Sequence, residues 1–166
     1  FQSRCEELCN DLFHPKWEFR HGAAVGLCAI IKRQGDGAGK CADASAVDMD
    51  QLHAAWLEDM AIRLICVCAL DHFGDFSGRA DSDQVLAPVR DTAGQALGAV
   101  LHHMAAAAVS AVLKSLILLQ GLDDWHVRHG GLLGVKYLVA VRVDLVQMLL
   151  PELLPVIQRG LQDQSD

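Results

Sequence analysis

Trp125-His-Val-Arg-His-Gly-Gly-Leu-Leu-Gly134 is the stretch that decides the fold of this chain. An earlier stretch, Trp17-Glu-Phe-Arg-His-Gly-Ala-Ala-Val-Gly26, repeats its pattern of tryptophan, arginine, histidine and two spaced glycines. A weaker copy is centred on Arg90, which is followed by small residues at the same spacing. Arg90 lies 38 residues before Arg128, an interval near the period of helical-hairpin repeats. The repeated positions are Trp17, Arg20, His21, Gly22, Gly26, Arg90, Trp125, Arg128, His129, Gly130 and Gly134.

The spacing within each copy predicts a helix that packs closely against its neighbours. Apolar and small residues recur three and four positions apart after each arginine, which is the spacing of one helical face. Glycine inside a helix costs about 1 kcal/mol relative to alanine, so repeated glycines favour close helix contacts as compensation. Each arginine is expected to pack its stem and to reach turn carbonyls or acidic side chains. Asp83, Asp123 and Asp124 are the candidate acidic partners.

The rest of the chain also has helical patterning, and no stretch convincingly predicts a strand. We expect an all-α chain whose helices form antiparallel pairs, two complete outer–inner hairpins, a third, and half of a fourth. Ser45 and Asp48 resemble a capping box, and Pro88 suits a first helical turn. Seven helices are expected near residues 3–13, 15–33, 46–72, 84–104, 107–119, 123–142 and 144–161.

Five stretches that cover nearly the whole chain carry a family resemblance. They are FQSRCEELCNDLF, WEFRHGAAVGL, WLEDMAIRLICVCALDHFGDF, VLAPVRDTAGQALGAVL and WHVRHGGLLGVKYLVAVR. Together they resemble consecutive HEAT repeats of the TATA-binding-protein-associated, SNF-type ATPase family, which removes TATA-binding protein (TBP) from promoter DNA. The resemblance implies a HEAT-repeat solenoid of residues 1–166, with TBP as partner and a nuclear location.

The same resemblance implies that this chain is a fragment without catalysis of its own. In the family, ATP and Mg²⁺ serve a C-terminal SNF-type ATPase whose motifs do not occur in these residues, so no cofactor is expected here. The family's latch segment has no clear match. An alternative is a HEAT scaffold for a different client, of the transport-receptor or phosphatase-subunit type. A third class is an enzyme that uses the cysteines or histidines.

Metal, nucleotide and redox sites are not favoured by the residue spacing. Gly35 to Lys40 lacks the glycine, the serine or threonine and the preceding strand of a phosphate loop. His126 and His129 are one helical turn apart, but no second pair with ligand spacing accompanies them. None of the six cysteines forms a Cys-x-x-Cys pair, which favours buried free thiols. We therefore expect no catalytic, cofactor-binding or metal-binding residues.

Charge and hydropathy limit the partners. The net charge of −7 disfavours direct nucleic-acid binding. The most apolar run, Met104 to Leu119, is too short for a membrane span and contains Lys114.

Because solenoids present residues at their hairpin turns, we expect the starts of the three aligned helices to form one partner-binding edge. Its candidate residues are Lys16, Trp17, Asp83, Asp123, Asp124 and His126.

Overall fold

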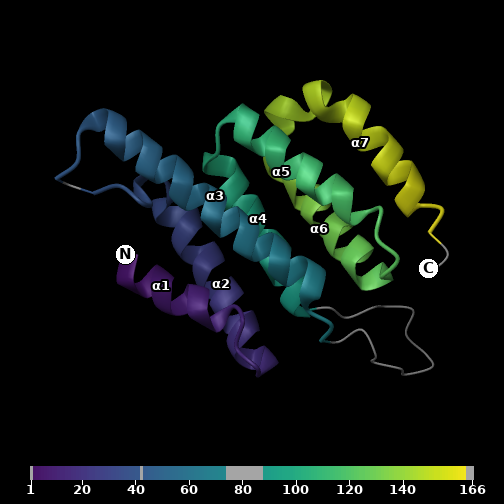
Figure 1. Cartoon of the computed structure of the whole chain (residues 1–166), viewed down its shortest axis with the longest axis horizontal. Helices are drawn as coiled ribbons and strands as arrows, with labels where there is room; N and C mark the ends of the chain where they lie inside the picture. Colours follow the sequence, from purple (N-terminus) through teal and green to yellow (C-terminus); the bar gives the residue numbers. More distant parts are fainter. Residues whose placement is uncertain (1, 42, 74–87, 164–166) are drawn as a thin grey trace.

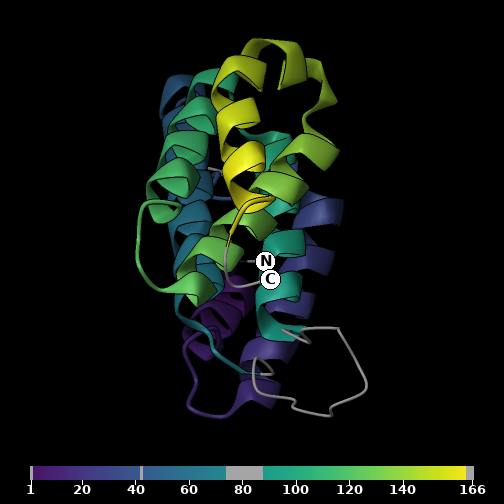
Figure 2. The ribbon, with the colours of Figure 1, turned by 90° about the vertical axis from the view of Figure 1, so that its right-hand side faces the viewer.

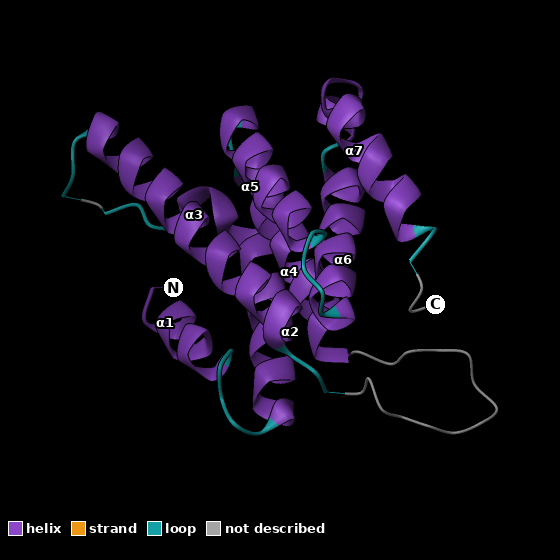
Figure 3. Cartoon of the chain, turned by 45° about the vertical axis from the view of Figure 1, so that its right-hand side comes forward, coloured by secondary structure: helices purple, strands orange, loops and turns teal. Residues whose placement is uncertain are grey.

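The computed structural model describes residues 2–41, 43–73 and 88–163, and within them every regular element is helical (Figure 3). The prediction of an all-α chain is therefore confirmed. Two short 3-10 turns, Gly35–Gly37 and Val143–Leu145, accompany the helices. The α-helices are α1 Gln2–Asp11, α2 Trp17–Gln34, α3 Ala46–Leu70, α4 Pro88–His103, α5 Ala106–Leu119, α6 Trp125–Val141 and α7 Val146–Gly160.

Helix starts follow local hydrogen-bonding chemistry. The Ser45 hydroxyl accepts a hydrogen bond from the backbone N–H of Asp48 at 3.3 Å, so the predicted cap of α3 is confirmed. Asp124 caps α6 by accepting from the backbone N–H of His126 at 2.9 Å. Pro88 is the first residue of α4. A backbone N–H at this position has no acceptor within the helix, so proline costs no hydrogen bond there.

Two predicted helix boundaries were wrong. Pro15 lies before α2 rather than in its first turn, because Lys16 is the N-cap with an extended backbone. The third helix ends at Leu70, since Asp71 leaves the helical conformation while its N–H still bonds to Val67. Positions 84–87 of the predicted fourth helix lie outside the described residues.

The helices form two layers, with α2, α4 and α6 in one and α1, α3, α5 and α7 in the other (Figures 1 and 2). Helix α4 occupies the centre, packed against α2, α3 and α6. Its side chains are almost all buried, including those of Val89, Arg90 and Leu97, each 0% exposed. Alanine and glycine on α4 let three neighbours approach at once, as the small-residue pattern predicts.

The repeated glycines do not all serve close packing. A Cβ at Gly130 would lie 1.9 Å from the carbonyl oxygen of Cys68, so α6 rests directly on the backbone of α3. A Cβ at Gly134 would lie 2.5 Å from a methyl group of Leu116 on α5. The Cβ position of Gly26 lies 3.1 Å from Leu8, but no atom of the described residues lies within 4 Å of the Cβ position of Gly22. The expected close contact at Gly22 was therefore wrong, because this residue faces solvent.

Candidate functional site

The starts of α2, α4 and α6 lie next to one another along one edge of the molecule. His21 Nδ1 on α2 is 3.3 Å from the carbonyl oxygen of Pro88 and 3.1 Å from the hydroxyl of Thr92, both on α4. Arg90 on α4 in turn donates to the carbonyl oxygen of His126 on α6 at 2.7 Å. We call this the hairpin edge: the first turns of α2, α4 and α6 with the adjoining ends of α3, α5 and α7.

Arg20 connects two segments of the hairpin edge at the start of α2. Its Nη1 donates to the carbonyl oxygens of His14 and Pro15, both at 2.9 Å, in the turn before α2. Its Nε donates to the carboxylate of Asp71, the residue that ends α3. The Asp71 side chain is only 2% exposed, so this ion pair is largely removed from water. Arg20 thus ties together the turn before α2 and the end of α3.

Arg128 repeats the same arrangement at the start of α6. Its Nη1 donates to the carbonyl oxygens of Leu122 at 3.0 Å and Asp123 at 2.7 Å. Its Nε and Nη2 donate to the carboxylate of Asp163, after the end of α7, at 2.6 and 2.8 Å. These hydrogen bonds raise the pKa of the Arg128 guanidinium above its ordinary value. Two repeats therefore use arginine in the same structural role.

The expected type of arginine contact is confirmed, but the acidic partners expected for Arg128 were wrong. Asp83, expected near Arg90, lies outside the described residues. The carboxylates that bind Arg20 and Arg128 belong to Asp71 and Asp163, which follow antiparallel helices. Asp123 offers Arg128 only its backbone carbonyl, and the Asp124 carboxylate caps α6. Helix ends that meet only after folding supply these partners, so spacing from the arginines could not identify them.

Arg90 differs from the other two arginines because it is completely buried. Its guanidinium carbon lies 5.9 Å from the centre of the Trp125 ring, a cation–π contact between α4 and α6. Its bond to the His126 carbonyl reaches the same helix. The central repeat thus uses its arginine to hold two parallel helix starts together.

The tryptophans of the hairpin edge are half-buried and have ring partners. Trp17 stacks on Phe73 with ring centres 4.2 Å apart and an interplanar angle of 7°. Trp125 stacks on His126 at 3.9 Å. Trp17 also packs against the hydrophobic core, which favours a structural role for this residue. Lys16, Asp123 and Asp124 are exposed, while the position of Asp83 lies outside the described residues.

Two open crevices accompany the repeated arginines at the hairpin edge. One, of about 340 Å³, lies beside Arg20 and Asp71 and includes Phe13 and Leu70. The other, also about 340 Å³, lies beside Arg128 and Asp163. Phe13 is 50% exposed and Leu70 69% exposed, so the first crevice has an apolar rim. Such surfaces can receive side chains of a protein partner.

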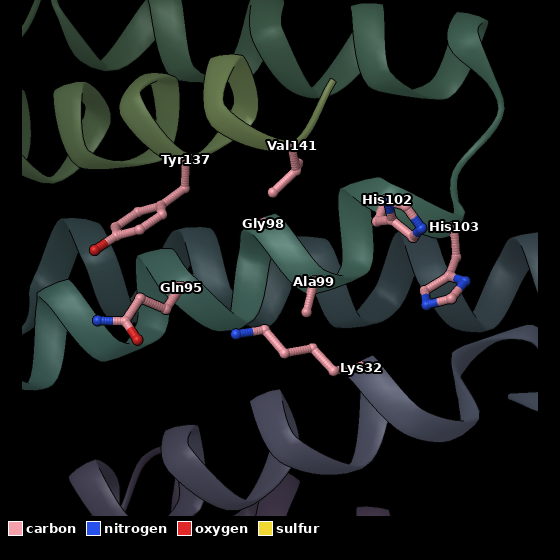
Figure 4. Close-up of a pocket in the computed structure, with 8 residues that line it drawn as sticks. All are labelled: Lys32, Gln95, Gly98, Ala99, His102, His103, Tyr137 and Val141. Carbon is pink, nitrogen blue, oxygen red and sulfur yellow. The ribbon is translucent and has the colours of Figure 1, made fainter. Parts of the chain in front are cut away.

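A third hollow lies away from the hairpin edge, on the layer formed by α2, α4 and α6 (Figure 4). Its volume is about 400 Å³, and Lys32, Gln95 and Tyr137 extend toward it. Asp91 accepts hydrogen bonds from Gln95 and from the Tyr137 hydroxyl, both at 2.9 Å, which fixes the polar groups of this surface. The hollow is open and combines one lysine with neutral groups, which suits binding better than covalent chemistry.

The thiols of Cys9 and Cys68 are poor candidates for nucleophilic chemistry. Burial raises the pKa of the Cys9 thiol to about 11, and burial likewise holds the pKa of Cys68 far above its ordinary value. Both are therefore protonated near neutral pH and unreactive. Cys41 is exposed.

None of the helices in the described ranges is long and apolar enough to cross a membrane.

Comparison with known proteins places this chain among TBP-associated factors. No family model matches it. TATA-binding protein-associated factor 172 of Homo sapiens is 53% identical over 165 residues, which cover 99% of this chain and 9% of that protein. TATA-binding protein-associated factor mot1 of Aspergillus fumigatus is 44% identical over 176 residues, covering 100% of this chain and 9% of that protein. Factor MOT1 of Saccharomyces cerevisiae is 33% identical over 177 residues with the same coverage.

The fold and the hairpin edge define an all-α region of stacked helices in which two repeats use the same arginine contacts. The chain spans about 9% of the length of the curated relatives it matches, so it corresponds to one region of those relatives. Homology over its whole length shows that the chain belongs to the family of TATA-binding protein-associated factors. The resemblance found in the sequence is thereby confirmed.

Proposed function

We propose that this chain is a HEAT-type scaffold region of a nuclear regulator that removes TBP from promoter DNA, and that it contacts TBP. The observation that carries the proposal is homology along the entire chain to proteins named as TBP-associated factors. The repeated hairpins and their aligned helix starts support a scaffold role, because stacked repeats create extended binding surfaces. In this proposal, ATP hydrolysis belongs to a separate SNF-type ATPase region, which would require ATP and Mg²⁺.

The hairpin edge is the surface proposed for TBP. Asp123 and Asp124 are exposed at the start of α6, and Lys16 is exposed before α2. TBP is a basic DNA-binding protein, so exposed carboxylates favour its association and orientation. Arg128 donates a hydrogen bond to the Asp123 carbonyl oxygen, and the Asp123 residue itself is exposed. The neighbouring Phe13 and Leu70 add apolar surface on the same edge.

Charge changes at the edge test this proposal without removing helix capping. The variant combines Asp123→Lys with Asp124→Asn, because asparagine can still cap α6 while lacking the charge. We expect binding to recombinant TBP to weaken by about fivefold, or roughly 1 kcal/mol, as typical for exposed charge pairs. The loss should be larger at low salt, where screening is weaker. Calorimetric titration at two salt concentrations would measure it.

Glu58→Lys is the matched control because it reverses an exposed charge on α3, away from the hairpin edge. Circular dichroism would establish that both variants remain folded. Equal TBP affinity for the edge variant and the unmodified chain would remove this edge from the proposal. Absence of TBP binding by a longer protein that includes this region would favour another protein client.

A further inference from the structure

Folding brings together three side chains that are far apart in the sequence. His72 follows the end of α3, while Asp124 and His126 lie at the start of α6. His126 Nδ1 is 2.7 Å from Asp124 Oδ1, and His72 Nε2 is 4.0 Å from Asp124 Oδ2. One possible ligand atom from each residue lies within 4.8 Å of the other two. The two imidazole rings are stacked with centres 4.3 Å apart.

We propose that His72, Asp124 and His126 form a binding site for a divalent transition-metal ion of the Zn²⁺ class. Two imidazoles and one carboxylate are a ligand set that zinc accepts, with its remaining position open to water or another donor. Imidazole ligands favour zinc, copper, nickel or iron over magnesium and calcium, which prefer oxygen. This inference rests on side-chain geometry alone and is independent of the proposed TBP contact.

Two of the three ligands are already held in position. Asp124 is fixed because its Oδ1 also accepts the backbone N–H of His126 at 2.9 Å. The His126 side chain is only 12% exposed and lies against the Trp125 ring. Its Nδ1 lies 2.7 Å from Asp124 Oδ1. An anionic carboxylate beside an oriented imidazole is a prearranged pair of ligands.

The third ligand combines an anchored backbone with a movable ring. His72 follows Asp71, whose buried carboxylate is paired with Arg20 and also accepts the Phe73 N–H at 2.9 Å. The His72 side chain itself is 44% exposed, so its ring has room to turn. Metal binding requires this ring to tilt out of its stacked position and bring Nε2 toward Asp124. The ion replaces the hydrogen bond between His126 Nδ1 and Asp124, because both groups become its ligands.

No other group of three His, Cys, Asp or Glu side chains in the described ranges has this geometry. His102 and His103 are adjacent at the end of α4, but His103 Nδ1 lies 2.8 Å from the Asp36 carboxylate.

A bound ion at the proposed site would join the end of α3 to the start of α6. The bound ion would therefore cross-link two helical hairpins at the hairpin edge.

Titration with Co²⁺ and Zn²⁺ tests the site. Co²⁺ serves as the probe because its visible absorption reports nitrogen and oxygen ligands, while thiolate ligation adds near-ultraviolet bands. We expect one equivalent of Co²⁺ to bind without thiolate bands, and Zn²⁺ to displace it. Affinity should fall by about tenfold or more in His72→Gln and in Asp124→Asn, because each change removes one ligand. Zn²⁺ should raise the melting temperature of the unmodified chain but not that of His72→Gln.

His102→Gln and Cys41→Ser are the controls, since they remove an exposed histidine and the exposed thiol outside the site. Both should bind Co²⁺ as the unmodified chain does. His72→Gln changes an exposed side chain, and circular dichroism would verify its fold. The proposal is overturned if the chain binds no stoichiometric Co²⁺, or if the folded His72→Gln variant retains full affinity.

Discussion

Arg20 and Asp71 join the start of α2 to the end of α3, although 51 residues separate them. The same connection recurs between Arg128 and Asp163, at the start of α6 and beyond the end of α7. In both cases the arginine also binds two carbonyl oxygens of the turn that precedes its helix. The arginine of the repeat therefore acts as a connector between antiparallel helices.

Asp71→Ala should strongly destabilise the chain. It would leave the Arg20 guanidinium, 19% exposed, without the carboxylate of Asp71, which is only 2% exposed. Removing one partner of a buried ion pair typically costs about 3–5 kcal/mol. Asp163→Ala is the matched comparison and should cost less, because Asp163 is 22% exposed. Urea unfolding would measure both, and equal losses would contradict the role of burial.

Gly130→Ala and Gly22→Ala should have opposite effects on stability, although both glycines occupy the same repeat position. The new methyl group at position 130 would collide with the Cys68 backbone of α3, and overpacking commonly costs about 1–3 kcal/mol. At position 22 the methyl group meets no atom within 4 Å in the part of the chain that the structure describes, so helix propensity should yield a gain of up to about 1 kcal/mol. Thermal unfolding of the two variants would compare them directly.

Helix α4 should contain the most slowly exchanging backbone amides among the described helices. It is buried between α2, α3 and α6, whereas α7 has contacts mainly with α6. Local opening of α4 therefore requires loss of most of the core, while α7 can open with little disruption. Hydrogen exchange followed by mass spectrometry should rank Pro88–His103 slower than Val146–Gly160. The reverse order would be incompatible with this packing.

Cys41 should be the first thiol to react when the folded chain is titrated with a thiol reagent near pH 8. It is exposed, whereas burial raises the pKa of Cys9 to about 11 and keeps Cys68 protonated. Cys41→Ser should abolish the fast phase of the reaction and leave the slower phase. Peptide mapping after brief alkylation would identify the modified residue. Labelling of Cys68 before Cys41 would show that this packing does not persist in solution.

The sequence alone predicts the helical class, the seven helices and the repeated arginine motif, because helical periodicity and caps depend on residues close together in the chain. Ser45 and Pro88 mark helix starts by their own chemistry. The same local information also yields the family, since the repeated motifs are contiguous stretches. It did not distinguish Gly22 from Gly130, whose local patterns are alike.

Only the tertiary structure decides which distant residues meet. Asp71 reaches Arg20, and His72 reaches Asp124 and His126, because α3 ends beside the starts of α2 and α6. Gly130 is closely packed and Gly22 is exposed because α3 lies across only the first of them. These contacts depend on how whole helices pack, and helix packing is set by the combined shape of many side chains rather than by the spacing within any one stretch.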